Sequence, residues 1–114
     1  MSGSYLAFDR DALIEKFGGG AGYNEFLRRR GMSLGFYMLP VGAVDRQHPH
    51  MADEVYFVLR GKASLQVGDS AIPVQSGSIV SVDHGEEHHF KDVTEDLKIL
   101  VIFAPPDAPD EDEQ

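Results

Sequence analysis

The stretch QHPHMADEVYFVLRG, residues 47–61, contains the pattern that decides the fold. His48 and His50 stand one residue apart, and Glu54 opens a run of β-branched and aromatic residues that ends in a glycine. Side chains two residues apart in a β-strand point to the same face, so His48 and His50 would project together. Glu54 has the same parity and joins them if a short bend spans residues 51–53. The stretch therefore predicts three potential metal ligands on one face of a strand.

Short strands are expected along most of the remaining chain. The segments rich in β-branched and aromatic residues are YNEFLRRR (23–30), SLGFYMLP (33–40), EVYFVLR (54–60), ASLQV (63–67), SIVSVD (78–83), EHHFKD (87–92) and KILVIFA (98–104). Such segments, separated by glycines and without a second long helix, are typical of a β-sandwich or barrel. Ahead of them, FDRDALIEKFGGG (8–20) predicts one short helix that begins at Asp9 or Asp11 and ends at its glycines.

The length of 114 residues suits one folded domain. We expect an N-terminal arm with the short helix over residues 1–20, a β-barrel domain over residues 21–104 and an acidic tail over residues 105–114. The tail, PPDAPDEDEQ, holds five acidic residues and no basic one. This composition is typical of a disordered, solvated end, with a partner-binding segment as the alternative.

Composition excludes several classes of function. The chain has no cysteine, so any metal site must use nitrogen and oxygen ligands. The net charge of −9 argues against a nucleic-acid partner, because such binding relies on clustered lysine and arginine. The chain has neither an apolar run long enough to span a membrane nor a signal peptide at its start. We therefore expect a cytoplasmic protein with no membrane partner.

A second cluster of histidines lies in DHGEEHHFKD, residues 83–92. It offers His84, His88 and His89 on a glycine-containing turn that leads into a strand, and one of them could complete the metal site. Neighbouring residues of a strand face opposite sides, so His89 is expected outside the barrel if His88 points inward. His84 is expected in solvent at the mouth. The G-x-S-x-G motif of a hydrolytic serine does not accompany this cluster.

The two histidine stretches together resemble the two motifs of the cupin superfamily, in its small single-domain form. The first motif is matched, with every spacing met, by Gly42, His48, His50, Glu54 and Gly61. The second is matched in register by Gly77, Asp83, Gly85, His88 and Asp92. Aspartate stands at two positions where the family usually has proline and asparagine, and those positions shape turns. The resemblance covers residues 34–104 well.

The resemblance implies an all-β fold, a double-stranded β-helix that is also called a cupin or jelly-roll barrel. It further implies a metal site made of His48, His50, Glu54 and His88. Three imidazoles and one carboxylate suit one divalent first-row transition metal, namely Fe, Mn, Ni, Co or Zn. An octahedral ion would keep two positions open for water, substrate or dioxygen. The alternative is a cupin that holds its histidines in a hydrogen-bonded core without metal.

Two side chains near the expected metal are candidates for catalysis. Tyr56 shares the parity of Glu54 and would face the same interior, and His84 would lie at the mouth. Either could serve as a general acid or base.

Substrate-binding candidates come from other strands. Arg28 and Arg30 would share one face of their strand and could meet an anionic substrate, with surface solvation as the alternative. Tyr37 and Phe90 are candidates for a pocket wall, in a wider set whose best member is Tyr56 and whose alternative role is ordinary barrel core. The other members of that set are Tyr23, Phe36, Met38 and Tyr56.

Three classes of function remain open for a small-molecule substrate. The first is a metal-dependent, dioxygenase-type oxidoreductase acting on a small oxygenated or aromatic molecule. The second is a metal-dependent isomerase, lyase or decarboxylase, and the third is a non-enzymatic cupin that binds or senses a small molecule. We also expect a homodimer, formed through strand edges and the outward apolar positions Val55, Phe57 and Leu59.

Overall fold

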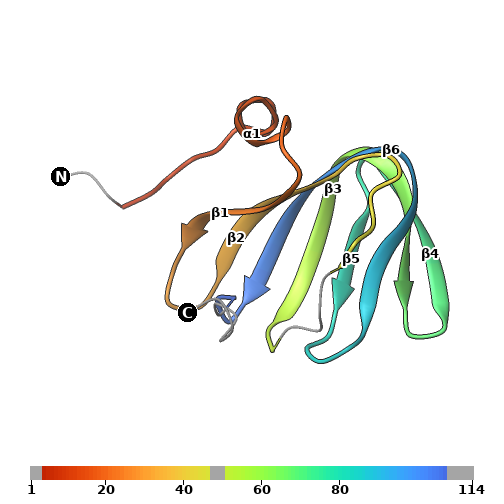
Figure 1. The fold of residues 1–114 in the computed structure, drawn as a ribbon. Helices are drawn as coiled ribbons and strands as arrows, with labels where there is room; N and C mark the ends of the chain where they lie inside the picture. The colour runs from red at the N-terminus through yellow and green to blue at the C-terminus, as the bar shows by residue number, and fades with distance from the viewer. Residues whose placement is uncertain (1–3, 47–50, 108–114) are drawn as a thin grey trace.

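The computed structural model of the chain describes residues 4–46 and 51–107. The described residues form one helix and six strands, shown in Figure 1. These elements are α1 (Arg10–Phe17), β1 (Gly22–Arg28), β2 (Ser33–Leu39), β3 (Asp53–Val67), β4 (Ser70–Gln75), β5 (Ile79–Val82) and β6 (His88–Ala104). The all-β fold with one short helix confirms the expectation from sequence. The predicted ligands His48 and His50, and residues 108–114 of the predicted tail, lie outside the described residues.

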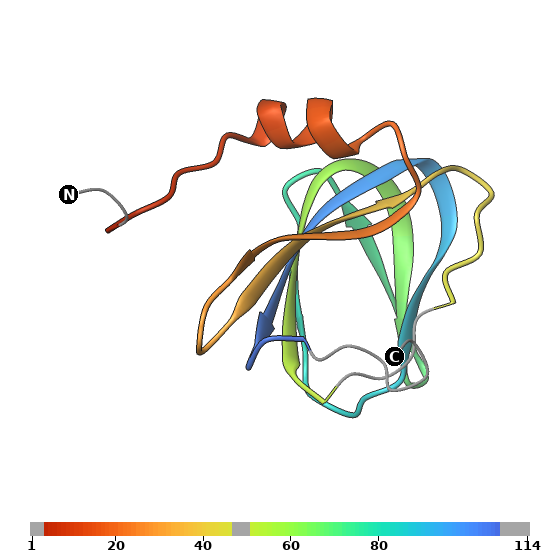
Figure 2. The same ribbon diagram turned by 60° about the vertical axis from the view of Figure 1, so that its left-hand side comes forward.

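Two long strands, β3 and β6, form the frame of the barrel. The first half of β3 pairs with β5 and with the last part of β6, and the second half of β3 pairs with β4 and with the first part of β6. β2 pairs with the last part of β6, and β1 pairs with β2 at the edge. Figures 1 and 2 show how the bent strands curl around one interior, with α1 outside it. One wall therefore consists of β1, β2, β5, the first half of β3 and the last part of β6, and the other consists of β4, the second half of β3 and the first part of β6. Each long strand contributes to both walls.

Each long strand corresponds to two of the short strands expected from sequence. Gly61 was expected to separate two strands, but it bends β3 instead of ending it. Its φ is 104°, and a Cβ there would lie 2.3 Å from the carbonyl oxygen of Asp96 on β6. The register between β3 and β6 shifts on both sides of this glycine. A bulge that needs a glycine therefore turns one strand from one wall into the other.

β4 was not among the strands expected from sequence, and Pro73 lies in its middle. Proline cannot donate a backbone hydrogen bond, and it is tolerated in a sheet when the strand lies at the edge. β4 occupies such an edge, next to β3. Val67 pairs with Ser70, so Gly68 and Asp69 form a two-residue hairpin loop. That Gly-Asp pair was the sequence signal for this hairpin.

The interior of the barrel holds the main apolar core. Its large members come from both walls, and they are Leu39, Tyr56, Val58, Leu65, Phe90, Leu97, Ile99, Val101 and Phe103. Within β2, β3 and β6, residues that face this core alternate with residues that face outward. This alternation is the two-residue periodicity of a half-buried strand, and it is what makes the inward direction of a given residue readable from sequence.

A second, smaller core lies outside the barrel, under α1. Phe36, Met38 and Leu59 are buried there, and Leu13, Ile14 and Phe17 of α1 pack against them. α1 follows Asp9 at its N-terminus and ends at Gly18, as its sequence indicates. Leu59 was expected to be available to a partner, but it is only 5% exposed because the helix covers that part of the outer face.

Asp92, the second motif residue that stands in place of asparagine, has a left-handed backbone with φ of 51°. We expect Asp92→Ala to lower the free energy of unfolding by about 1 kcal/mol relative to Asp92→Gly, because only alanine carries a Cβ in that conformation. Both variants remove the same carboxylate, so each is the other's control. Urea unfolding measures the difference, and equal stabilities would contradict it.

Candidate metal centre

The site is built from the two walls of the barrel. Glu54 and Tyr56 lie two residues apart on β3 and face the interior, with exposed fractions of 2% and 1%. The bend required just before them occurs at Met51 and Ala52. His88 opens β6 and pairs with Val67 at the far end of β3. The bend of β3 therefore brings its own first residues opposite the start of β6.

The side chains of Glu54, Tyr56 and His88 meet around one imidazole nitrogen. His88 Nε2 lies 2.9 Å from Glu54 Oε1 and 2.9 Å from the Tyr56 hydroxyl. On the other side of the ring, His88 Nδ1 lies 2.8 Å from the carbonyl oxygen of Glu86. A carbonyl only accepts hydrogen bonds, so Nδ1 carries the hydrogen and donates it. In the neutral imidazole, the lone pair of Nε2 therefore points toward the carboxylate and the phenol.

The electrostatics of His88 reflect this arrangement. Burial lowers the pKa of His88, but the hydrogen bonds to the Glu54 carboxylate and the Glu86 carbonyl raise it, and the negative charges of Glu54 and Asp45 raise it further. The net result is a pKa above the usual value for histidine. The surroundings thus favour a positive charge at His88 Nε2.

The same geometry suits a cation between Glu54 and His88. A carboxylate oxygen and an imidazole lone pair at 2.9 Å repel one another unless a proton or a metal ion lies between them. Both side chains are buried, and a buried carboxylate is costly unless a positive charge compensates for it. The backbone hydrogen bond at His88 Nδ1 orients the ring as the second hydrogen bond of a metal-binding histidine does. The two described members of the predicted ligand set therefore fit a divalent metal.

Of the predicted ligands, only Glu54 and His88 belong to the described ranges 4–46 and 51–107. Within those ranges, no group of three or more histidine, aspartate or glutamate side chains is arranged to hold a metal. The assignment of His48 and His50 as ligands stays a prediction.

Asp45 is a structural residue of the site that sequence reasoning missed. It is 8% exposed, accepts a hydrogen bond from the Tyr37 hydroxyl at 2.6 Å and accepts another from the Phe90 backbone N–H at 2.7 Å. It thereby ties the segment that leads to residues 47–50 to β2 and β6. A single aspartate in a loop carries no sequence signal for such a role.

The two predicted pocket aromatics lie close to this network. Phe90 is 2% exposed and its ring meets that of Tyr56 edge to face, with centroids 5.0 Å apart. Tyr37 is partly buried against the core. Burial raises the pKa of its hydroxyl, and the hydrogen bond to Asp45 raises it further. Both side chains therefore support the site from within the core, while a direct contact with substrate stays a prediction.

The two other histidines of the second cluster point away from the interior. His84 is exposed at the turn before β6, where its backbone N–H and its Nδ1 lie 2.8 and 3.0 Å from Asp53 Oδ1. This pair joins the start of β3 to the turn that precedes His88. His89 is exposed, as expected. A catalytic role for His84 stays a prediction.

The predicted arginine pair is not held on one strand face. β1 ends at Arg28, and Arg30 lies in the exposed turn that follows, so the parity argument does not extend to it. Arg28 donates two hydrogen bonds to the carboxylate of Glu25, at 3.0 and 2.8 Å, and a third to the carbonyl oxygen of Asp107. Its guanidinium already has protein partners.

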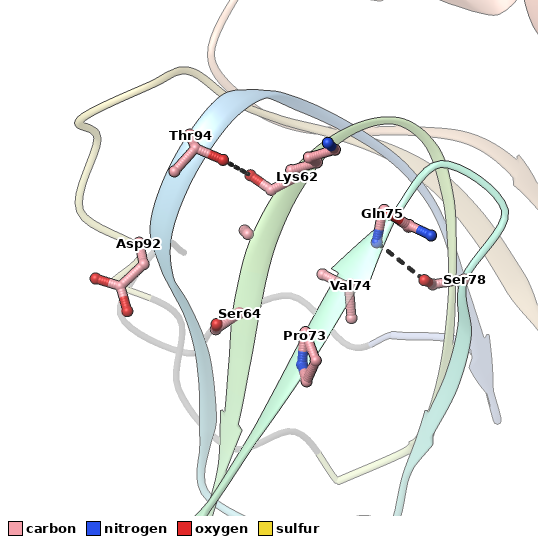
Figure 3. A pocket seen from close by; sticks show the side chains of 9 residues that line it. Lys62, Ser64, Pro73, Val74, Gln75, Ser78, Asp92 and Thr94 are labelled. Atoms are coloured by element: carbon pink, nitrogen blue, oxygen red, sulfur yellow. Dashed lines mark hydrogen bonds between the residues drawn. The ribbon is translucent and has the colours of Figure 1, made fainter.

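Two hollows on the described surface differ in the residues that line them. The larger, of about 560 Å³, contains none of the predicted site residues and is lined by Lys62, Ala63, Ser64, Pro73, Val74, Gln75, Ser78, Asp92 and Thr94 (Figure 3). The other, of about 400 Å³, reaches the candidate centre and is lined by Val44, Asp45, Gln66, Gly68, Glu87, His88 and His89. Of these two hollows, the second is the one whose lining includes a predicted ligand, His88. Among the described residues, no helix is long and apolar enough to cross a membrane.

Comparisons with known proteins agree with the motifs and with the fold. The chain is 45% identical over 103 residues to "Uncharacterized protein SCO3923" of Streptomyces coelicolor, covering 90% of this chain and 98% of that protein. The structure of BH2720 from Bacillus halodurans is similar with a TM-score of 0.77 and 19% identity, over 93% of this chain and 84% of that one. TT1209 from Thermus thermophilus has a TM-score of 0.74 and 22% identity, over 88% of this chain and 97% of that one.

The family comparison covers the part of the chain that forms the barrel. Residues 35–103 match the family described as Cupin domain. This range runs from β2 to the end of β6 and includes both histidine stretches. With the antiparallel barrel and its neighbours among solved structures, the match establishes that the chain belongs to the cupin domain family.

Proposed function

We propose that this cupin binds one divalent first-row transition metal through His48, His50, Glu54 and His88. The observation that supports it most directly is the buried contact of 2.9 Å between Glu54 Oε1 and His88 Nε2. A cation between these atoms removes their repulsion and compensates for the buried carboxylate. When bound, the metal supplies a Lewis acid with open positions for oxygen ligands.

The residues around the metal then have separate tasks. Glu86 orients the His88 ring through its carbonyl. Tyr56 is 1% exposed, and its hydroxyl lies 2.9 Å from His88 Nε2, the nitrogen that would hold the metal, so Tyr56 would be the proton donor of the site. Phe90 and the surrounding core keep bulk water from that hydroxyl. We propose that the centre serves a metal-dependent oxidoreductase of the dioxygenase type, acting on a small oxygenated or aromatic molecule, which would use this Lewis acid and this proton donor.

A metal-dependent isomerase, lyase or decarboxylase is the alternative, because it needs the same Lewis acid and a similarly placed proton donor. A non-enzymatic sensor would need only the metal and its open positions. The behaviour toward dioxygen distinguishes the three classes.

Protein purified without chelator is expected to carry about one first-row metal per chain. Glu54→Gln, and His48→Ala combined with His50→Ala, should weaken metal binding by more than about tenfold. At a hundred times the Kd, metal should raise the free energy of unfolding of the native chain by about 2.7 kcal/mol. Elemental analysis and thermal unfolding measure these effects.

His89→Ala is the matched control, since His89 is the exposed neighbour of His88. It should keep the metal content of the native chain. Equal metal in the ligand variants and in this control would refute the site.

For the reaction class, Fe(II)-loaded protein should consume dioxygen with a dihydroxylated aromatic substrate. Tyr56→Phe should retain its metal while turnover falls about a hundredfold, as for loss of a general acid. An oxygen electrode and product analysis give both rates. Turnover that persists without dioxygen or with Zn would favour the isomerase or lyase class, and tight binding without turnover would favour the sensor.

We also propose that the chain forms a homodimer through the outer face of β3 and β5. Phe57 and Ile79 are cross-strand partners there, with exposed fractions of 36% and 69%, and Val55 lies beside them partly buried. An exposed apolar patch on a sheet favours association with a second copy.

The homodimer predicts a specific change in mass. Phe57→Ser combined with Ile79→Ser should convert a dimer into a monomer, because it removes the apolar contact. Met32→Ser, an exposed apolar residue in the turn between β1 and β2, is the control and should stay dimeric. Light scattering measures the mass, and a monomeric native chain would disprove the proposal.

A further inference from the structure

Tyr23 on β1 packs against β2 at a position that has no side chain, Gly35. Its ring lies over Gly35 of β2, where an added Cβ would be only 2.0 Å from the ring. Gly35 pairs with the buried Val101, so this side of β2 faces the interior. The ring also meets that of Phe103 edge to face, with centroids 5.9 Å apart. The absence of a side chain at position 35 therefore lets a phenol from the edge strand lie against the interior of the barrel.

Phe103 connects this phenol to the candidate metal centre. It is the cross-strand partner of Glu54, and both residues face the interior. Tyr23 therefore contacts the residue that is paired with Glu54. Burial raises the pKa of Tyr23, and the negative charges of Asp107, Glu25 and Glu54 raise it further. The hydroxyl consequently stays protonated at neutral pH and acts as a hydrogen-bond donor within electrostatic range of Glu54.

The Tyr23 hydroxyl is available for a ligand. Within residues 4–46 and 51–107 it makes no hydrogen bond, and the residue is 38% exposed. Tyr37 and Tyr56 differ in this respect, because their hydroxyls are bonded to Asp45 and His88. A donor on a half-buried ring that contacts Phe103, the cross-strand partner of Glu54, is the kind of polar group that orients a ligand in an apolar pocket.

The charge around Tyr23 indicates which ligand group it can accept. Three carboxylates, those of Asp107, Glu25 and Glu54, act on its hydroxyl. Among the groups that act on this hydroxyl, the one cation is Arg28. Its guanidinium already donates hydrogen bonds to Glu25 and to the backbone of Asp107. With Glu54 bound to the proposed metal, the carboxylates of Asp107 and Glu25 still outweigh the Arg28 guanidinium at this point, which favours a carbonyl or hydroxyl oxygen over an anionic group.

We infer that the Tyr23 hydroxyl donates a hydrogen bond to an uncharged oxygen of the small molecule bound at the metal centre. Tyr23 is then a specificity-determining residue, and Gly35 is the residue that positions its ring. The inference rests on the proposed metal-binding function and narrows its substrate class to molecules with an uncharged carbonyl or hydroxyl group away from the chelating atoms.

The test uses metal-loaded full-length protein and catechol-based probes that chelate a metal through two oxygens. Catechol has no further polar group, whereas 2,3- and 3,4-dihydroxybenzamide add an uncharged amide carbonyl at two different positions. Tyr23→Phe should bind at least one of the amides about fivefold more weakly than the native chain does, because one hydrogen bond is lost. It should bind catechol as tightly as the native chain does. Calorimetric titration measures the affinities.

Two further variants make the result specific. Gly35→Ala places a Cβ against the Tyr23 ring and should reproduce the selective loss, whereas Tyr5→Phe, on the exposed arm, should change nothing. The native chain should also bind the amide more tightly than the corresponding dihydroxybenzoate, and the reverse preference would overturn the assignment of an uncharged group.

The outcomes separate the inference from the proposed function. If the native protein binds metal and catechol but the Tyr23→Phe variant keeps the native affinity for both amides, the role of Tyr23 is disproved and the metal centre stands. Native protein that takes up no metal disproves the metal centre, and the role of Tyr23 falls with it.

Discussion

The contact between Glu54 and His88 is the constraint on which the rest of the structure depends. A carboxylate and an imidazole, both almost completely buried, lie 2.9 Å apart in an apolar barrel. Such a pair is stable when a proton or a metal ion compensates for the carboxylate and the ring is held in one orientation. The Glu86 carbonyl provides the orientation, and the raised pKa of His88 shows that the surroundings favour positive charge at its other nitrogen. The walls of the barrel supply the rigidity.

The bend of β3 explains how residues far apart in the sequence reach this contact. Glu54 belongs to the half of β3 that pairs with β5, and His88 pairs with the other end of the same strand. The bulge at Gly61 bends β3, and the bent strands curl around one interior (Figure 2). Glu54 and His88 are both buried, and their side chains meet there. Asp45, which precedes residues 47–50, accepts hydrogen bonds from Tyr37 on β2 and from Phe90 on β6. The polar groups of the site are thus supported from several strands.

Much of this arrangement could be predicted from the sequence, because strand periodicity determines which side chains face inward. Glu54 and Tyr56 share a parity, and both face the interior. The expected breaks were less reliable. Gly61 bends a strand that it was expected to end, and Pro73 lies in a strand that was not expected at all. Glycine and proline mark an irregularity of the backbone, but whether it becomes a turn, a bulge or an edge depends on the neighbouring strands.

By itself, the sequence determined the family, the barrel class and the inward face of the motif strand, since these follow from local spacing and periodicity. Only the tertiary structure decided which long-range partners each polar group has. It showed that Arg28 is bonded to Glu25 and Asp107, that α1 covers Leu59, and that Asp45 joins β2 to β6. It also placed the Tyr23 ring over Gly35. The physical reason is that these contacts join residues from different elements, and their distances depend on how the whole sheet bends.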